Sequence, residues 1–277
     1  MMKTKSNENN FNINLHEKKI YSQNGEDGII EFIFSVIGVT NKFSVEFGVG
    51  DGFECNTIYL LEKKKWKGLM MDYGAEQQIH LNTVMKKAWS SRNGGLANNV
   101  KRGFKFIRKI IKRSKRSIEF SRNVKIEKIT AENIQQLFQK YNVPNDFDLL
   151  SIDIDYNDYW VWKAITDYSP RLVVIEYNSS IPPTESRVVP YNPDASWDGT
   201  NYFGASLLAL RNLGLSKGYT LVGCDSRGVN AFFVKSDLIK RIKINDIDQL
   251  YRSPQYGQLV NNVHIGHPPS DKKMIEI

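Results

Sequence analysis

The chain has few cysteines and histidines and no long hydrophobic run. Its 277 residues include two cysteines and four histidines, which excludes a disulfide framework and a cysteine-rich zinc site. No stretch approaches the ~18 apolar residues of a membrane-spanning helix, and no apolar segment near the N-terminus has the pattern of a signal peptide. With 41% hydrophobic residues, the composition is that of a globular protein, and we expect it in the reducing cytoplasm.

Positive charge is concentrated in residues 101–128, which contain many Lys and Arg and, as acids, only Glu119 and Glu127. The net charge of the whole chain is +8, so the other residues are near neutral and the pattern indicates a local anionic partner. We expect a basic helical insertion at about residues 92–122. It can pack on its own domain and contact an anionic substrate or glycan, or lie peripherally on the anionic inner face of a membrane. Nucleic acid is disfavoured as a partner, because only two Phe interleave the cations.

Short apolar runs alternate with segments of helical periodicity along most of the chain. Strands are predicted within residues 42–52, 67–74, 124–129, 147–153, 171–178, 219–226 and 228–236, and helices within 25–38, 55–66, 75–89, 130–141, 158–168 and 204–218. This alternation predicts a Rossmann-like α/β fold with a seven-stranded, mostly parallel sheet and helices on both faces. The last two strands must form an antiparallel hairpin, because they are joined by a short turn and a parallel pair needs a long crossover.

One main domain is expected between two shorter parts. Residues 1–20 are polar and rich in asparagine, which predicts a flexible arm, and residues 21–235 form the domain. Residues 236–277 form a C-terminal extension. An irregular loop at about residues 179–200 interrupts the domain, and long loops of this kind are usually functional. We therefore expect an active-site loop there.

A glycine turn follows the first strong strand, with Gly48, Gly50 and Gly52 spaced G-x-G-x-G. Glycines at such a turn let the backbone approach a ligand closely. The dinucleotide fingerprint would place its third glycine at Phe53, so the spacing weakens a nicotinamide interpretation. Asp72 closes the second strand, where an acid can accept hydrogen bonds from ribose hydroxyls. The alternative is a tight turn and an unrelated surface acid, but the combination favours a nucleoside-binding fold.

Two neighbouring strands end in oxygen-bearing side chains, Asp153 and Asp155 on one and Glu176 and Asn178 on the other. The carboxyl ends of parallel strands are where ligands bind in α/β sheets, and residues two apart point the same way. The four side chains can therefore hold Mg²⁺ or Mn²⁺, which prefer hard oxygen ligands. Without a metal, Asp153 or Asp155 can act as general base. In a third interpretation, Asp155 or Asn157 caps the following helix.

The ordered motifs resemble class I S-adenosylmethionine-dependent methyltransferases, and most closely the FkbM-like group. The segments that carry the resemblance are "YSQNGEDGII", "VEFGVGDGFECNT", "KGLMMD", "TAENI", "LLSIDID", "VVIEYN", "YFGAS" and "GYTLVGCDSRGVNAFFV". Cys55 departs from the small residue that the family usually has there. The resemblance implies that the donor is bound by Glu46, Gly48, Gly50, Asp51, Asn56, Asp72, Thr130, Ala131 and Asp153, with Glu132 flanking the adenine beside Thr130 and Ala131.

The expected activity is O-methyl transfer to a carbohydrate, nucleotide-sugar or related polyhydroxylated or phosphorylated acceptor, with S-adenosylmethionine as donor and a divalent cation as a further candidate. The acceptor is expected to contact Gln23, Tyr191, Trp197, Tyr202 and His267, and His264 and His267 are also candidates for a base from the C-terminal tail. The rival hypotheses are an RNA methyltransferase and a non-catalytic membrane- or glycan-binding module on the same fold.

Overall fold

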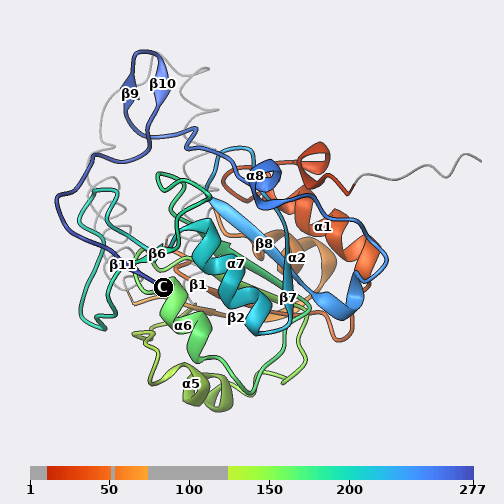
Figure 1. Cartoon of the computed structure of the whole chain (residues 1–277). Coiled ribbons are helices and arrows are strands. Elements are labelled where there is room, and N and C mark those ends of the chain that lie inside the picture. The colour runs from red at the N-terminus through yellow and green to blue at the C-terminus, as the bar shows by residue number, and fades with distance from the viewer. Residues whose placement is uncertain (1–10, 51–53, 74–123) are drawn as a thin grey trace, which may run out of the picture.

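A seven-stranded sheet forms the centre of the computed structural model, which describes residues 11–50, 54–73 and 124–277 (Figure 1). The strand order is β3-β2-β1-β4-β5-β8-β7. The bounds are β1 (Phe43–Phe47), β2 (Lys67–Met71), β3 (Val124–Lys125), β4 (Leu149–Ile152), β5 (Leu172–Glu176), β7 (Tyr219–Cys224) and β8 (Asn230–Lys235). Strands β1 to β5 pair in parallel, whereas β8 is antiparallel to both β5 and β7. The predicted α/β class, with a mostly parallel sheet and a closing antiparallel hairpin, is confirmed.

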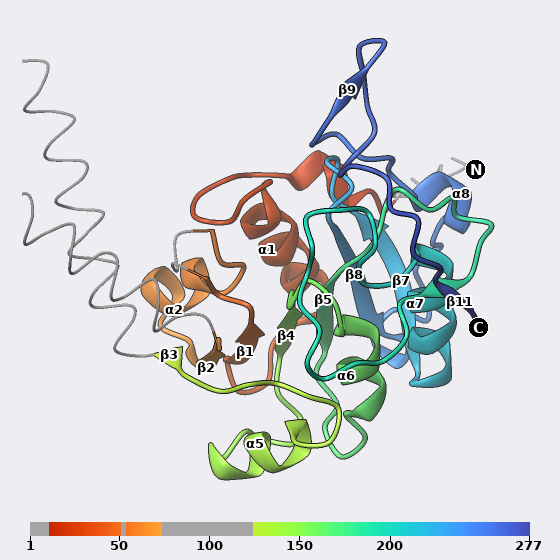
Figure 2. The same ribbon diagram turned by 90° about the vertical axis from the view of Figure 1, so that its left-hand side faces the viewer.

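Helices cover both faces of this sheet, because its strands bury side chains on both sides. Along β4, Leu149 packs in one apolar cluster and Leu150 in the other, as the alternation of side chains along a strand requires. One face carries η1 (Ile13–His16), α1 (Glu26–Ile37) and α2 (Ile58–Lys64), and the other carries α5 (Ile134–Lys140), α6 (Asp158–Ala164) and α7 (Leu207–Ser216) (Figure 2). The two short helices of the C-terminal part are η2 (Ser236–Leu238) and α8 (Ile247–Leu250).

The C-terminal extension folds back over the domain. Its last strand, β11 (Ile275–Glu276), pairs with β6 (Arg187–Val188), which lies inside the loop that we expected to be irregular. Strands β9 (Leu259–Val260) and β10 (Val263–His264) form a hairpin that projects from the body (Figure 1). The extension and the 179–200 loop therefore build one wall of the molecule together.

The prediction of a flexible arm is wrong for residues 11–16. Phe11 and Ile13 are 8% and 2% exposed, because they pack in the same apolar cluster as α1 and the outer strands. A Cβ atom on Gly28 would lie 2.1 Å from the carbonyl oxygen of His16. Only glycine therefore allows α1 to pack this closely against the segment that precedes it.

Several predictions fall outside the described residues: the helix at 75–89, the basic insertion at 92–122, most of the 101–128 segment and Asp51. The strand predicted from residue 124 is limited to β3.

Helix α5 begins at Ile134, three residues later than a Thr130 cap implies. Thr130 and Asn133 nevertheless bond each other's backbone N–H groups through their side chains. Among the helices of the described ranges, none is both long and apolar enough to cross a membrane.

Candidate functional site

Two adjoining pockets lie at the carboxyl ends of the parallel strands, where α/β sheets bind ligands. The larger has a volume of about 450 Å³ and includes Asp72, Asp155 and Trp197 in its lining. The smaller has a volume of about 210 Å³. Gly48, Gly50 and Asp153 line both. The two pockets are therefore parts of one cleft, and we call them the large and the small pocket.

The glycine turn after β1 forms the junction between the pockets. Gly48 and Gly50 have φ angles of 69° and 50°, which non-glycine residues rarely adopt. A Cβ atom on Gly48 would lie 1.4 Å from the carbonyl oxygen of Asp153, whereas one on Gly50 would meet no described atom within 4 Å. The Gly50 N–H donates to Asp72 Oδ2 at 2.8 Å. Asp72 thus holds the turn from the neighbouring strand.

Glu46, at the end of β1 just before this turn, forms hydrogen bonds to the start of α2. It is buried, and it accepts hydrogen bonds from the backbone N–H groups of Asn56 at 2.7 Å and Thr57 at 3.0 Å, and from the Thr57 hydroxyl. Asn56 Nδ2 donates in turn to the Ser151 hydroxyl at 3.1 Å. Burial raises the pKa of Glu46 to about 6, although these hydrogen bonds oppose the shift. Its observed role is to fix the start of α2 against β1, at the edge of the small pocket.

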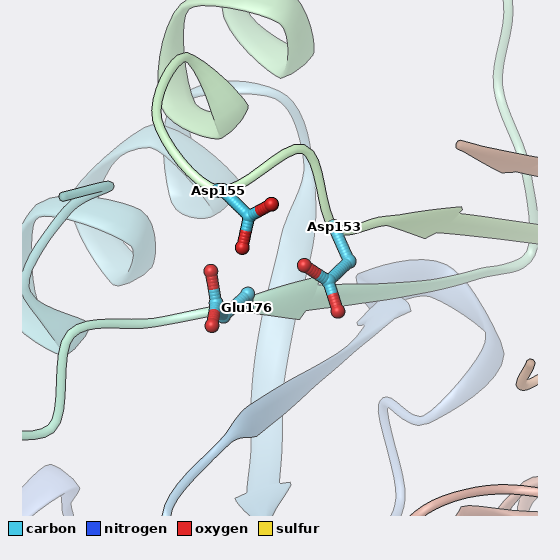
Figure 3. A group of neighbouring side chains, drawn as sticks. All are labelled: Asp153, Asp155 and Glu176. Carbon is cyan, nitrogen blue, oxygen red and sulfur yellow. The ribbon is translucent and has the colours of Figure 1, made fainter. Parts of the chain in front are cut away.

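Three carboxylates gather where β4 and β5 end. Asp153, Asp155 and Glu176 each place an oxygen within 4.8 Å of the others, and Figure 3 shows Asp155 and Glu176 facing each other with Asp153 beside them. Asp155 has a φ of 65°, an uncommon conformation that turns its side chain into the group. Glu176 Oε2 is buried and accepts no hydrogen bond from the described residues. An unpartnered buried oxygen of this kind calls for a ligand.

Mutual repulsion adds to burial in raising the pKa values of this acidic group. Burial raises the pKa of Asp153 and of Glu176 well above their usual values, and neighbouring carboxylates raise them further. Asp158, in the first turn of α6, is fully buried beside them, and burial raises its pKa to about 7. Burial likewise raises the pKa of Asp155, whereas the charge of His267 lowers it. Such a group is stabilised by protons or by a cation.

The side chain of Asn178, which was predicted as a fourth metal ligand, forms hydrogen bonds to other parts of the protein. Its Nδ2 donates to the carbonyl oxygens of Asn201 at 2.7 Å and Phe203 at 3.0 Å, and its Oδ1 accepts from the Ser180 N–H at 3.2 Å. The buried amide therefore fastens the loop to the end of β5. The three carboxylates form the compact set of candidate ligands, and Asn178 Oδ1 already accepts one hydrogen bond.

Asn157 occupies the N-cap position of α6, as the third interpretation allowed, but its side chain does not act as the cap. The Asn157 side chain makes no cap hydrogen bond and instead donates to the carbonyl oxygen of Asn192 at 2.8 Å. Asp158 Oδ1 accepts from the Ile154 N–H at 2.8 Å. Asp158 therefore organises the turn between β4 and α6, and Asp155 is left to face the cleft.

Aromatic side chains of the loop and of the C-terminal extension meet at the large pocket. The His267 ring lies 4.5 Å from the Trp197 ring and 5.3 Å from the Tyr256 ring, measured between centroids. Burial lowers the pKa of His267, while the charge of Asp155 raises it. Trp197 lines the pocket and is 38% exposed. His267 thus packs against Trp197 beside the large pocket, and their assignment to the acceptor stays a prediction.

Other predicted contact residues have structural roles. The Tyr191 hydroxyl bonds the Ala131 N–H at 3.2 Å and the Glu132 carboxylate, which ties the loop to the start of α5. Tyr202 packs on Tyr156 and carries Lys272 over its ring. Neither tyrosine lines the cleft in the described structure.

The cleft lining agrees with part of the predicted residue set. Of the predicted residues, Gln23, Glu46, Gly48, Gly50, Asn56, Asp72, Asp153, Asp155 and Trp197 line it. Gln23 lies at the small pocket, away from the expected acceptor side. Thr130 and Ala131 do not line the cleft, whose edge is formed by Glu127, Lys128 and Ile129 instead. Glu26 and Asn230 also line the small pocket and were not predicted, although the segments "YSQNGEDGII" and "GYTLVGCDSRGVNAFFV" that carry the resemblance contain them.

In comparisons with known proteins, no family model and no curated protein matches the chain. Function is therefore inferred from the cleft itself.

The close approach of Gly48 to Asp153 predicts unequal effects of alanine at the two glycines. Gly50→Ala places a side chain in open space at positive φ and should lower the free energy of unfolding by roughly 1–2 kcal/mol. Gly48→Ala adds a backbone collision, which costs about 1–3 kcal/mol more when the structure has to move. Urea unfolding of both variants measures the difference. Equal losses would contradict the tight contact between the glycine turn and β4.

The raised pKa of Asp158 predicts that stability falls as the pH rises. Because its pKa of about 7 in the folded protein exceeds the ordinary aspartate value of 3.8, the folded state binds more protons than the unfolded state between these values. Each pKa unit corresponds to about 1.4 kcal/mol, so the free energy of unfolding should fall by the order of 2 kcal/mol between pH 5 and pH 8. Asp158→Asn should flatten this dependence, as measured by urea unfolding without divalent cations. An equally steep profile in the variant would assign the pH dependence to other groups.

Proposed function

We propose that the chain is a class I S-adenosylmethionine-dependent methyltransferase that methylates a hydroxyl group of a carbohydrate or related polyhydroxylated acceptor. The observation that carries this proposal is the cleft, in which the glycine turn, Asp72, Asp153 and Asp155 converge at the carboxyl ends of adjacent strands, with Glu176 beside the last two. The donor, when bound, supplies a methyl group on a positively charged sulfonium. The sheet order, with its closing antiparallel hairpin, agrees with this fold family.

The cleft suits a ligand with a nucleoside at one end and an amino acid at the other. The large pocket falls within the range of about 300–1,000 Å³ that is usual for small-molecule sites, and the small pocket continues it past the glycine turn. Asp72 lies in the large pocket, where its carboxylate can accept hydrogen bonds from ribose hydroxyls. The nucleoside is therefore assigned to the large pocket and the amino-acid portion to the small pocket, with the sulfonium near Asp153.

The acidic group supplies what an acceptor hydroxyl needs. As the hydroxyl oxygen forms its bond to the methyl carbon, the bond from that carbon to the donor sulfur would break and release S-adenosylhomocysteine. The hydroxyl proton has to leave as well, and Asp153 or Asp155 can accept it. Raised pKa values bring these carboxylates closer to the range in which a general base is effective at neutral pH. Trp197 lines the large pocket together with Asp155, and His267 packs against Trp197. Aromatic rings at this position suit the apolar face of a sugar.

A divalent cation, Mg²⁺ or Mn²⁺, is the second way in which the same residues can act. Asp153, Asp155 and Glu176 form a compact set of hard oxygen ligands, and the unpartnered Glu176 Oε2 fits a metal ligand. A cation there would relieve the repulsion among the carboxylates and lower the pKa of a bound hydroxyl. Asp153 would then serve both the metal and the donor side of the cleft.

The charge of the cleft opposes the rival RNA-methyltransferase hypothesis. Its described lining contains seven acidic residues, Glu26, Glu46, Glu54, Asp72, Glu127, Asp153 and Asp155, and one cationic residue, Lys128. Phosphate groups would be repelled by this surface, so a neutral sugar portion is the favoured acceptor. A non-catalytic glycan- or membrane-binding module would leave the acidic group without a use.

Donor binding is the first prediction of this proposal. S-adenosylhomocysteine, titrated calorimetrically into the protein, should bind with micromolar affinity, and Asp72→Ala should weaken binding at least tenfold, because it removes both the ribose acceptor and the partner of Gly50. Asp237→Ala is the matched control and should bind S-adenosylhomocysteine as the wild type does. Asp237 follows β8 at the end of the sheet opposite the cleft. No binding to the wild-type protein, with or without Mg²⁺, would overturn the proposed function.

Metal binding is tested separately from activity. Mn²⁺, followed by electron paramagnetic resonance, should bind the wild-type protein, and Glu176→Gln should weaken it at least tenfold by removing one anionic ligand. Asp237→Asn is again the control. If Mn²⁺ bound equally to the wild type and to Glu176→Gln, Glu176 would not be a ligand. If it bound neither protein, Asp153 and Asp155 would act without a metal.

A further inference from the structure

The small pocket is closed by two residues that the donor and acceptor assignments leave unused, Glu26 and Asn230. Glu26 is the first residue of α1, and Asn230 is the first residue of β8. They are 0% and 4% exposed, and both line the pocket. Asn230 Nδ2 donates to Glu26 Oε1 at 2.9 Å. A pair brought together from opposite ends of the chain thus forms one wall of the pocket.

The hydrogen bonds of this pair leave acceptor capacity on both side chains. Glu26 accepts from the Asn24 N–H at 2.7 Å and from Asn24 Nδ2 at 3.2 Å, besides Asn230. A carboxylate offers about four acceptor positions, so at least one is left. Asn230 Oδ1 is buried and accepts no hydrogen bond from the described residues. Since an ionised carboxylate cannot donate, Asn230 must present its amide nitrogen to Glu26, and the unpartnered atom is the oxygen.

The charge around the pair selects the kind of ligand. The acids that line the small pocket are Glu26, Glu46, Glu54 and Asp153, and no Lys or Arg is among its described lining residues. Lys19 lies 3.6 Å from Glu54, and both side chains of this ion pair are about half exposed. A buried pocket with negative charge and unused acceptors fits a cationic group with several N–H donors. An ammonium group, which has three donors and no acceptor, meets both requirements.

Two further buried carboxylates hold the pair in place. Asp27 Oδ2 accepts from the N–H groups of Ile20, Tyr21 and Ser22 at 2.8, 2.6 and 2.8 Å, which fixes the segment before Glu26. Asp225 accepts from the backbone N–H of Asn230 and fixes the start of β8. The two side chains are therefore positioned by the protein itself before any ligand enters, which reduces the ordering that binding requires.

We propose that Glu26 and Asn230 hold the α-ammonium group of the amino-acid portion of the methyl donor. This inference rests on the proposed function and assigns residues to the amino-acid end of the donor. Glu26 supplies the opposite charge and Asn230 Oδ1 a second acceptor. The proposal also gives the "GED" motif a role in donor recognition, in addition to its place at the start of α1.

The test compares two ligands on two proteins. S-adenosylhomocysteine and its deamino analogue, in which hydrogen replaces the α-ammonium group, are titrated calorimetrically into the wild-type protein and into Glu26→Gln. We expect the wild type to bind S-adenosylhomocysteine at least tenfold more tightly than the analogue, because hydrogen bonds to charged groups are the strong ones. Glu26→Gln should lose most of this preference while binding the analogue as the wild type does.

Two further variants keep the test specific. Glu31→Gln changes a carboxylate on the same helix that pairs with Lys64, and it should keep the full preference. Asn230→Ala leaves Glu26 in place and should reduce the preference in the same direction, which guards against a folding defect peculiar to Glu26→Gln. Unchanged binding of the analogue reports in each case that the cleft is intact.

The outcomes separate this inference from the proposed function. If the wild type bound neither ligand, both would be overturned. If S-adenosylhomocysteine bound but the wild type did not prefer it to the analogue, or Glu26→Gln weakened both ligands equally, the ammonium assignment would be overturned while donor binding stood.

Discussion

The cleft depends on the contact between the glycine turn after β1 and the end of β4. A Cβ atom at Gly48 would lie 1.4 Å from the Asp153 carbonyl oxygen, so the two backbone segments touch. This contact places Asp153 at the junction of the two pockets, and Asp72 fixes the other side of the turn through Gly50. The contact between the glycine turn and the end of β4 therefore sets where the donor side and the acceptor side of the cleft lie relative to each other.

Negative charge concentrated at the strand ends is the second constraint. The protein satisfies some of these carboxylates internally: Glu46 bonds the start of α2, and Asp27 and Asp225 bond backbone N–H groups of turns. Asp27 Oδ1, Asp158 Oδ2, Glu176 Oε2 and Asn230 Oδ1 are among the buried oxygens without a hydrogen-bond partner in the described residues. Buried polar atoms are rarely left unpaired without a reason, and of these four residues Glu176 and Asn230 are directly paired on the neighbouring strands β5 and β8. On the proposed function, Glu176 and Asn230 each have a different ligand.

The sequence allowed the sheet and its polar edge to be predicted because both depend on local patterns. Short apolar runs define buried strands, and an acid just after such a run must lie at the strand end. The side-chain contacts of Asn178, Tyr191 and Tyr202 could not be predicted in this way, since they depend on how the loop meets distant segments. Likewise, Phe11 and Ile13 look like part of a polar arm until the outer strands that cover them are placed. The pairing of Glu26 with Asn230 spans 204 positions, so their contact could not be predicted from either segment alone.

The two sides of the cleft are built with different rigidity, and this bears on how specificity arises. The donor side is made by the sheet, by glycine turns and by buried carboxylates, whose contacts cannot shift without breaking several hydrogen bonds. The acceptor side is made by the 179–200 loop and the C-terminal extension. They meet through the short β6–β11 pairing, through ring contacts of His267 and through an ion pair between Asp198 and Lys272, and exposed ion pairs contribute little to stability. Substitutions in the loop or in the extension can therefore change which acceptor is bound while the donor side stays intact. The Asn178 amide joins the loop to β5 at a point that does not include the acidic group.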